Sequence, residues 1–267
     1  MGNKKISKED AITRKKQGIR SLNGLLESYI NSGNEDLYKK AFNISSWIHS
    51  YTNYLHFESR FIPAKNIAYK RGDVVKANLG YNVGNELGGI HYAVVIDKEN
   101  KHRSGMITIV PLSSRKERVY ERDIDLGNDL YKQLNTKLTT LKKSANAENE
   151  KLEELIRLIK AMAESQFPDK SENEANVKKA EQVFDQICNQ QAELLQKIDL
   201  LKNMQDEIDR MKTGSIAKVE QITSISKMRI IDPKQTGNVL HNISLSAASM
   251  KLINSRLQEL YLFNNDE

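Results

Sequence analysis

Two side chains that can exchange protons lie in and just after one glycine-rich stretch. Residues 80–89, here called the glycine loop, hold four glycines between two β-rich segments, Asp73–Leu79 and His91–Ile96. Glycine frees the backbone, and loops held by strands commonly carry binding or catalytic groups. We expect Glu86 and His91 to lie close together there. Imidazole changes charge near neutral pH, so His91 suits general acid or base catalysis, with Glu86 orienting the ring or acting as partner base.

Chemistry on a phosphate would also need cations and hydrogen-bond donors. Arg71, Lys227 and Arg229 are candidates for positioning phosphates, because cations contact backbone oxygens whatever the base sequence. Structural alternatives stay open: Arg71 as scaffold before the first strand, and Lys227 and Arg229 as the solvent-facing side of a strand. His49 and His56 share a helix face but lack further ligands, so we expect no metal and no cofactor.

The first part of the chain that must position these groups is helical. Apolar residues recur at threes and fours across residues 8–60, interrupted by the turn signal Asn31-Ser32-Gly33-Asn34. Pro63 ends the helical segment. The pattern predicts a helical pair, and we place an N-terminal helical arm at residues 1–66.

Residues 67–127 and 214–267 have short β-branched runs and predict a small, bent sheet. Val119–Leu126 alternates apolar and charged residues, which favours an edge strand. Two more strand-like stretches follow at Ser215–Thr223 and Ile225–Ile231. Residues 244–263 predict a closing helix that Ser244 or Ser246 caps.

A long segment of another kind, residues 128–213, separates the two β parts. Its apolar residues step by three and four in two series on either side of Phe167–Ser171, which predicts an antiparallel coiled-coil hairpin. Because the ends of a hairpin are adjacent, it can be inserted into a domain that continues after it. Partner binding and a spacer role are equally open. The seam consists of Leu134, Leu138, Leu141, Ala145, Leu152, Leu155, Ile159, Met162, then Val177, Ala180, Phe184, Ile187, Leu194, Ile198, Leu201 and Ile208.

Charge, apolar runs and cysteine content limit the partners and the compartment that we expect for this protein. The net charge is +6, and residues 1–70 alone hold 12 Lys and Arg against 6 Asp and Glu. This surplus is compatible with nucleic acid, or with a solvated helical face. No apolar run approaches a membrane span, and the first residues, MGNKKIS, lack the apolar core of a signal peptide. We therefore expect no membrane partner. Cys188 has no cysteine to pair with, which fits a reducing cytoplasm.

Four blocks of sequence, in order, resemble the MazF/PemK toxins. They are Arg71–Val75 (RGDVV), Gly84–Gly89 (GNELGG) with Ala93–Ile96 (AVVI), Val110–Ser114 (VPLSS), and Ala217–Ile222 with Ile225–Arg229. The resemblance covers the two β parts and the last helix, so the helical arm and the hairpin would be additions to the family's domain.

The resemblance implies an α+β fold built on a small SH3-like β-barrel, here split by the hairpin. It implies a homodimeric endoribonuclease that cuts single-stranded RNA without a metal, and a cognate antitoxin as partner. Where the family has Arg after the Gly-Gly pair and Thr at the end of the following strand, this chain has His91 and Ser113. Ser113 and the amides of Gly88 and Gly89 would hold the phosphate oxygens, with Ser114 beside them.

Two other functions stay open at this point. The same domain could bind nucleic acid or protein without catalysis, with the hairpin as an assembly arm. Alternatively, the hairpin could cover an RNA groove and control the activity.

Overall fold

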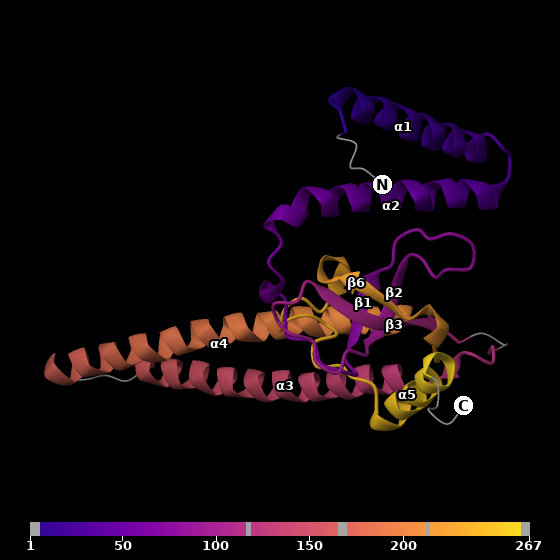
Figure 1. Cartoon of the computed structure of the whole chain (residues 1–267). Helices are drawn as coiled ribbons and strands as arrows, with labels where there is room; N and C mark the ends of the chain where they lie inside the picture. Colours follow the sequence, from indigo (N-terminus) through magenta and orange to yellow (C-terminus); the bar gives the residue numbers. More distant parts are fainter. Residues whose placement is uncertain (1–5, 116–118, 165–169, 212–213, 263–267) are drawn as a thin grey trace. The chain divides into compact units, whose positions relative to one another are not determined.

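This computed structural model describes residues 6–115, 119–164, 170–211 and 214–262. Contacts divide the chain into two compact units, Met1–Phe61 with Leu79–Gly89, and Ile62–Asn78 with Ile90–Glu267. Helices and an antiparallel sheet are both present, which confirms the expected α+β class (Figure 1). Within the described ranges, none of the helices has the length and apolar content of a membrane span.

The first unit contains the predicted helical pair. Helix α1 spans Lys8–Ile30 and begins with a capping box in which Ser7 and Asp10 bond reciprocally. Helix α2 spans Glu35–Phe57, is capped by Asn34, and continues into a short 3-10 turn, η1, at Glu58–Arg60. The expected turn therefore falls between the two helices, at residues 31–34.

The glycine loop belongs to the same unit as this helical pair. A Cβ added to Gly80 would lie 2.9 Å from a ring carbon of Trp47, and Gly80 has a φ of +85°. A side chain at this position would therefore clash with the indole and strain the backbone. The close approach of Trp47 explains why one glycine of the loop is required.

The second unit is built on a sheet of seven short antiparallel strands. Their order is β4-β5-β3-β2-β1-β7, with β6 also paired to β3. The first half of β3 pairs with β6 and its last three residues pair with β5, so β3 joins both parts of the sheet. The strands are β1 (Val74–Asn78), β2 (Ile90–Val95), β3 (Met106–Ser114), β4 (Ile124–Asp125), β5 (Ser215–Ala217), β6 (Thr223–Ser226) and β7 (Ile230–Asp232).

This sheet differs from the expected one in three respects. Among the described strands β4 and β7 do not pair, so the sheet is not closed into a barrel. The edge strand expected at Val119–Leu126 is only the two residues of β4. The strands expected at Ser215–Thr223 and Ile225–Ile231 are wrong in length, because 3-10 turns at Val219–Gln221 (η3) and Lys227–Arg229 (η4) break them.

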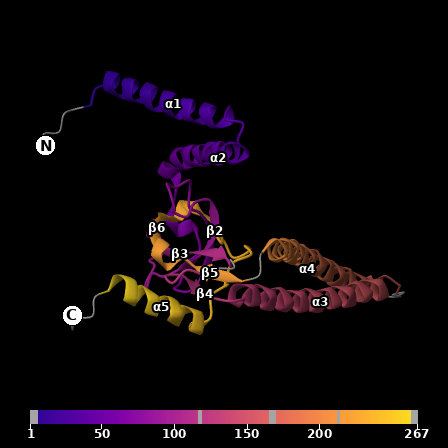
Figure 2. The same cartoon turned by 90° about the vertical axis from the view of Figure 1, so that its right-hand side faces the viewer.

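Two long helices leave the sheet and return to it. Helix α3 spans Asp129–Glu164 and α4 spans Lys170–Arg210, side by side in Figures 1 and 2. The Lys142 ammonium donates to Gln205 Oε1 at 3.4 Å, and Lys197 forms an ion pair with Glu148. Such contacts between early α3 and late α4 confirm an antiparallel hairpin. The expected turn at Phe167–Ser171 falls largely outside the described residues, and a supercoil stays a prediction.

The apolar seam predicted for α4 is only partly confirmed, because Leu194 and Ile208 are buried as expected and other positions are not. Val177, Phe184 and Ile198 were expected inside, but each side chain is about half exposed. Val183, one residue before Phe184, and Met204, between the predicted seam residues Leu201 and Ile208, are buried instead. Val183 and Met204 lie on one helix face with Gln190 and Lys197, at a spacing of seven residues. Because Gln190 and Lys197 are polar, apolar periodicity does not identify this face.

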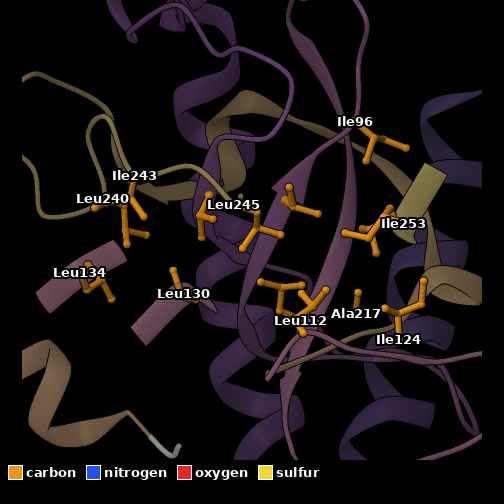
Figure 3. Close-up of a cluster of buried hydrophobic side chains, with 14 of the residues drawn as sticks. Ile96, Leu112, Ile124, Leu130, Leu134, Ala217, Leu240, Ile243, Leu245 and Ile253 are labelled. Atoms are coloured by element: carbon orange, nitrogen blue, oxygen red, sulfur yellow. The ribbon is translucent and has the colours of Figure 1, made fainter. Parts of the chain in front are cut away.

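The base of the hairpin shares the main core with the sheet. Leu130 and Leu134 of α3 pack in one buried cluster with residues of the strands, the segment before α5 and α5 itself (Ala247–Tyr261) (Figure 3). Met204 and Ile208 of α4 belong to the same cluster. The outer part of the hairpin has a separate small cluster around Leu152. The division of the chain at residues 127/128 and 213/214 stays a prediction.

A partly buried carboxylate joins the hairpin to the segment around the start of α5. Asp129, the first residue of α3, accepts from the N–H of Ser246 at 2.8 Å and from the hydroxyl of Ser249 at 2.6 Å. Burial alone would raise the pKa of Asp129, but these hydrogen bonds hold it below its ordinary value. Ser246 also caps α5, which confirms one of the two predicted caps.

If the hairpin base is part of the core, Leu134→Ala should lower the free energy of unfolding by about 2–5 kcal/mol, because it leaves a cavity. The matched variant Leu158→Ala, on the outer hairpin where the side chain is 44 % exposed, should cost less than about 1 kcal/mol. Urea unfolding measures both. Equal losses of unfolding free energy in the two variants would contradict the packing of the hairpin base in the main core.

Candidate functional site

His91 lies near the start of β2 with its ring half-buried. Its Nδ1 is 3.1 Å from the carbonyl oxygen of Leu112 on β3. A carbonyl can only accept, so Nδ1 must carry the hydrogen and donate it. This bond orients the ring and leaves Nε2 as the nitrogen that can take or give a proton.

Ser113 follows Leu112 on β3, opposite Ile216 of β5. Its Oγ is buried and has no hydrogen-bond partner within the described part of the chain. A buried hydroxyl without a partner costs about 1–3 kcal/mol, and such a group in a folded protein calls for an explanation. A ligand oxygen that reaches the hydroxyl would supply the missing partner.

Both residues line one open cleft, here called the His91 cleft, of about 310 Å³. Its walls come from β1, β2, the end of β3, the start of β5 and the last turn of α4. The inserted hairpin therefore forms part of the cleft. The residues with polar side-chain groups among those that line it are Lys76, His91, Tyr92, Ser113, Ser114, Glu207, Arg210 and Ser215.

A polar cluster fastens α4 to the sheet at the edge of this cleft. Glu207 of α4 pairs with Lys76 of β1, and the hydroxyl of Tyr92 on β2 donates to the same carboxylate. Lys76 and Tyr92 face each other across the β1–β2 ladder. We call these three residues the tether.

The tether shifts the titration of its members. Burial alone would raise the pKa of Glu207, but the hydrogen bonds from Lys76 and Tyr92, with the nearby charges of Lys76 and Arg210, hold it below its ordinary value. Burial first, and then Glu207, raise the pKa of the Tyr92 phenol far above its ordinary value. Glu207 is therefore anionic and Tyr92 neutral at physiological pH.

The three cations expected to position phosphates do not line the cleft. Arg71 bonds to Asn254 of α5. Lys227 is fully buried, where its ammonium donates to the carbonyl of Lys101 at 3.1 Å. Arg229 donates through Nε to the carbonyl of Asn78 at 2.8 Å. A 3-10 turn at Lys227–Arg229 replaces the strand on which these two side chains were expected to alternate, so their placement on a strand face was wrong. The role of the three cations in positioning phosphates stays a prediction.

The other predicted site residues lie in the glycine loop, in the first unit. Glu86 is exposed, and its proximity to His91 in the second unit stays a prediction. The N–H of Gly89 already donates to the carbonyl of Gly80 at 2.6 Å, so it is not available as an oxyanion donor. A Cβ on Gly88 would lie 2.7 Å from the same carbonyl oxygen, so this glycine is required for loop closure.

The sequence alone did not point to Lys76, Tyr92, Glu207 or Arg210. Lys76 and Tyr92 fit the ordinary alternation of a strand and carry no motif. Glu207 and Arg210 lie far from the glycine loop in the sequence. Glu207 and Arg210 are three apart near the end of the insertion, on one helix face. This pair of opposite charges on one helix face was the one feature of the sequence that could have indicated a polar site there.

Residues 70–161 match the sequence model of a family described as PemK-like, MazF-like toxin of type II toxin-antitoxin system. This segment belongs to the MazF/PemK family. The match contains His91 and Ser113 and runs from β1 into α3. MazF/PemK toxins are generally endoribonucleases. Comparison with curated proteins finds no match for the chain.

The lowered pKa of Glu207 predicts a pH-dependent contribution of the tether to stability. A carboxylate whose pKa is lower in the folded state stabilises the fold above its unfolded pKa, about 4.3, and loses that contribution as pH falls through the folded value. Glu207→Gln should therefore lower the free energy of unfolding by about 1–3 kcal/mol at pH 7, and by much less near pH 3.

Glu259→Gln serves as the control for this measurement. Its carboxylate pairs with Arg256 on the surface of α5 and is 58 % exposed, so the loss should stay below about 1 kcal/mol. Urea unfolding at several pH values gives both curves. A difference between the wild type and Glu207→Gln that stays constant down to pH 3 would contradict the assignment.

Proposed function

We propose that this MazF/PemK protein is the toxin of a type II toxin-antitoxin system and cleaves single-stranded RNA without a metal. His91 acts as general acid or base and Ser113 stabilises the phosphate. The observation that carries the proposal is the cleft itself, where an oriented imidazole and an unpartnered buried hydroxyl occur together.

The reaction needs one group that takes a proton and one that gives it. The 2′-oxygen of a ribose attacks the adjacent phosphorus as a base removes its proton, and the bond from phosphorus to the 5′-oxygen breaks as an acid protonates that oxygen. The products are a 2′,3′-cyclic phosphate and a 5′-hydroxyl. His91 Nε2 fills one of the two roles, and Glu86 is the candidate for the other.

Ser113 would act on the charge that grows on the phosphoryl oxygens. Its Oγ–H has no competing acceptor within the described residues, so it can donate to a phosphate oxygen without first breaking a bond. Donors that are already in place at a developing anion are among the largest contributions to catalysis. Ser114, exposed at the cleft's rim, would bind a neighbouring part of the RNA backbone.

The family also supports three proposals about context. A cognate antitoxin would bind and inhibit the protein, the toxin would act as a homodimer, and its RNA substrate would place it in the cytoplasm. Co-purification with the product of a neighbouring small reading frame, and the mass of the complex, test the first two.

His91→Ala should reduce cleavage of a long single-stranded RNA of mixed sequence in EDTA by about 10²–10⁴-fold, because it removes a proton-transfer group. His56→Ala, which removes an exposed histidine of α2, should have no effect. Gel analysis with end-group mapping follows the reaction. Full cleavage by His91→Ala would remove the assignment, and RNA binding without cleavage by the wild type would favour a binding module.

Ser113→Ala separates function from stability. Cleavage should fall by about 10–10³-fold, because a donor to the phosphate is lost. The thermal midpoint should stay the same or rise, because the change also removes a buried hydroxyl without a partner. A lower midpoint with unchanged cleavage would assign Ser113 a structural role instead.

A further inference from the structure

A phosphodiester in the His91 cleft would need a cation beside it. Each RNA phosphate carries a negative charge, and the charge on its oxygens must be held while the bonds rearrange. A serine hydroxyl and a histidine that must change protonation state do not supply a permanent positive charge. The lining of the cleft contains two side chains that are always cationic near neutral pH, Lys76 and Arg210.

Lys76 is already neutralised. Its ammonium pairs with Glu207 in the tether, and its side chain is 30 % exposed. A phosphate that recruited Lys76 would have to break this pair and leave Glu207 without its strongest partner. Removing one member of a partly buried pair is costly, so Lys76 serves better as an anchor than as a ligand.

Arg210 is not committed in this way. It is exposed on the last turn of α4, and in the part of the chain that the structure describes its guanidinium forms no hydrogen bond or ion pair within 4.0 Å. Its charge reaches Glu207, whose pKa it helps to lower, but Lys76 and Tyr92 hold that carboxylate directly. Lys76, Glu207 and Arg210 together leave one positive charge at the cleft.

The tether fixes the turn of α4 that carries Arg210. Glu207 and Arg210 are three residues apart, so they are neighbours on one face of α4, about 4.5 Å apart along the helix. Ile208, between them, is buried in the main core. The last turn of α4 is therefore fixed on two sides, and its arginine is carried on a rigid element instead of a loop.

We propose that Arg210, supplied by the inserted hairpin, is the phosphate-binding cation of the His91 cleft. Its planar guanidinium can donate two parallel hydrogen bonds to phosphate oxygens, which an ammonium cannot do with the same geometry. The proposal rests on the proposed RNA cleavage. It makes the hairpin a functional part of the site, because the hairpin would supply a group that binds the phosphate instead of only covering the cleft.

The test compares Arg210→Gln and Arg210→Lys with Lys202→Gln, which removes an exposed cation from the same helix away from the cleft. Binding of a mixed-sequence single-stranded RNA oligonucleotide is measured by fluorescence anisotropy, in the His91→Ala background to prevent cleavage. Cleavage of long RNA is measured with His91 intact. Thermal melting confirms that the variants fold.

Arg210→Gln should weaken binding about tenfold and make the dependence of log K on log salt shallower by about 0.7, the value for one phosphate contact on a single strand. It should lower the cleavage rate about 10²-fold. Arg210→Lys should keep the salt dependence and recover part of the rate. Lys202→Gln should match the parent protein in both assays.

The outcomes separate the two proposals. If Arg210→Gln and Lys202→Gln behave alike in binding and cleavage, the role of Arg210 is overturned while the nuclease proposal stands. If the wild type cleaves no RNA but Arg210→Gln specifically weakens binding, the nuclease proposal fails and the phosphate site stands. Absence of RNA binding by the parent protein would overturn the phosphate site.

Discussion

The pairing of β4 with β5 is the constraint on which the second unit depends. Ile124 lies opposite Ala217, and beyond this pair the N–H of Leu126 donates to the carbonyl of Ser215 at 2.9 Å. A long helical hairpin can leave a small sheet and return to it only where its two ends meet. These bonds bring the ends together, so both helices depart from one edge of the sheet.

Once its ends are fixed there, the base of the hairpin cannot remain a separate arm. Leu134 and Met204 are fully buried with the strands, while Glu207 reaches Lys76 and Tyr92 on the sheet. Apolar burial supplies most of the attachment energy, but it is not directional. The tether adds direction, because a carboxylate that accepts two hydrogen bonds holds α4 in one rotation about its axis.

Local patterns predicted the elements of this fold better than their contacts. The three-and-four spacing predicted both long helices, but not that polar Gln190 and Lys197 continue the row of Val183 and Met204. The apolar run at Ile225–Ile231 hid a 3-10 turn that buries Lys227. At the site, family motifs identified His91 and Ser113, whereas Glu207 and Arg210 reach the cleft only through tertiary packing, which no local pattern encodes.

If the cleft acts on a phosphate as proposed, two requirements of the reaction would be met by different elements. In the proposed reaction, proton transfer would fall to the imidazole of His91 on β2, and charge neutralisation to the guanidinium of Arg210 on α4. One side chain could not meet both demands well. Because the cation is carried by the hairpin, a rotation of α4 would change phosphate binding while the His91–Leu112 bond on the sheet stayed intact. The two proposed contributions would therefore depend on different elements, the first on the sheet and the second on the position of the hairpin.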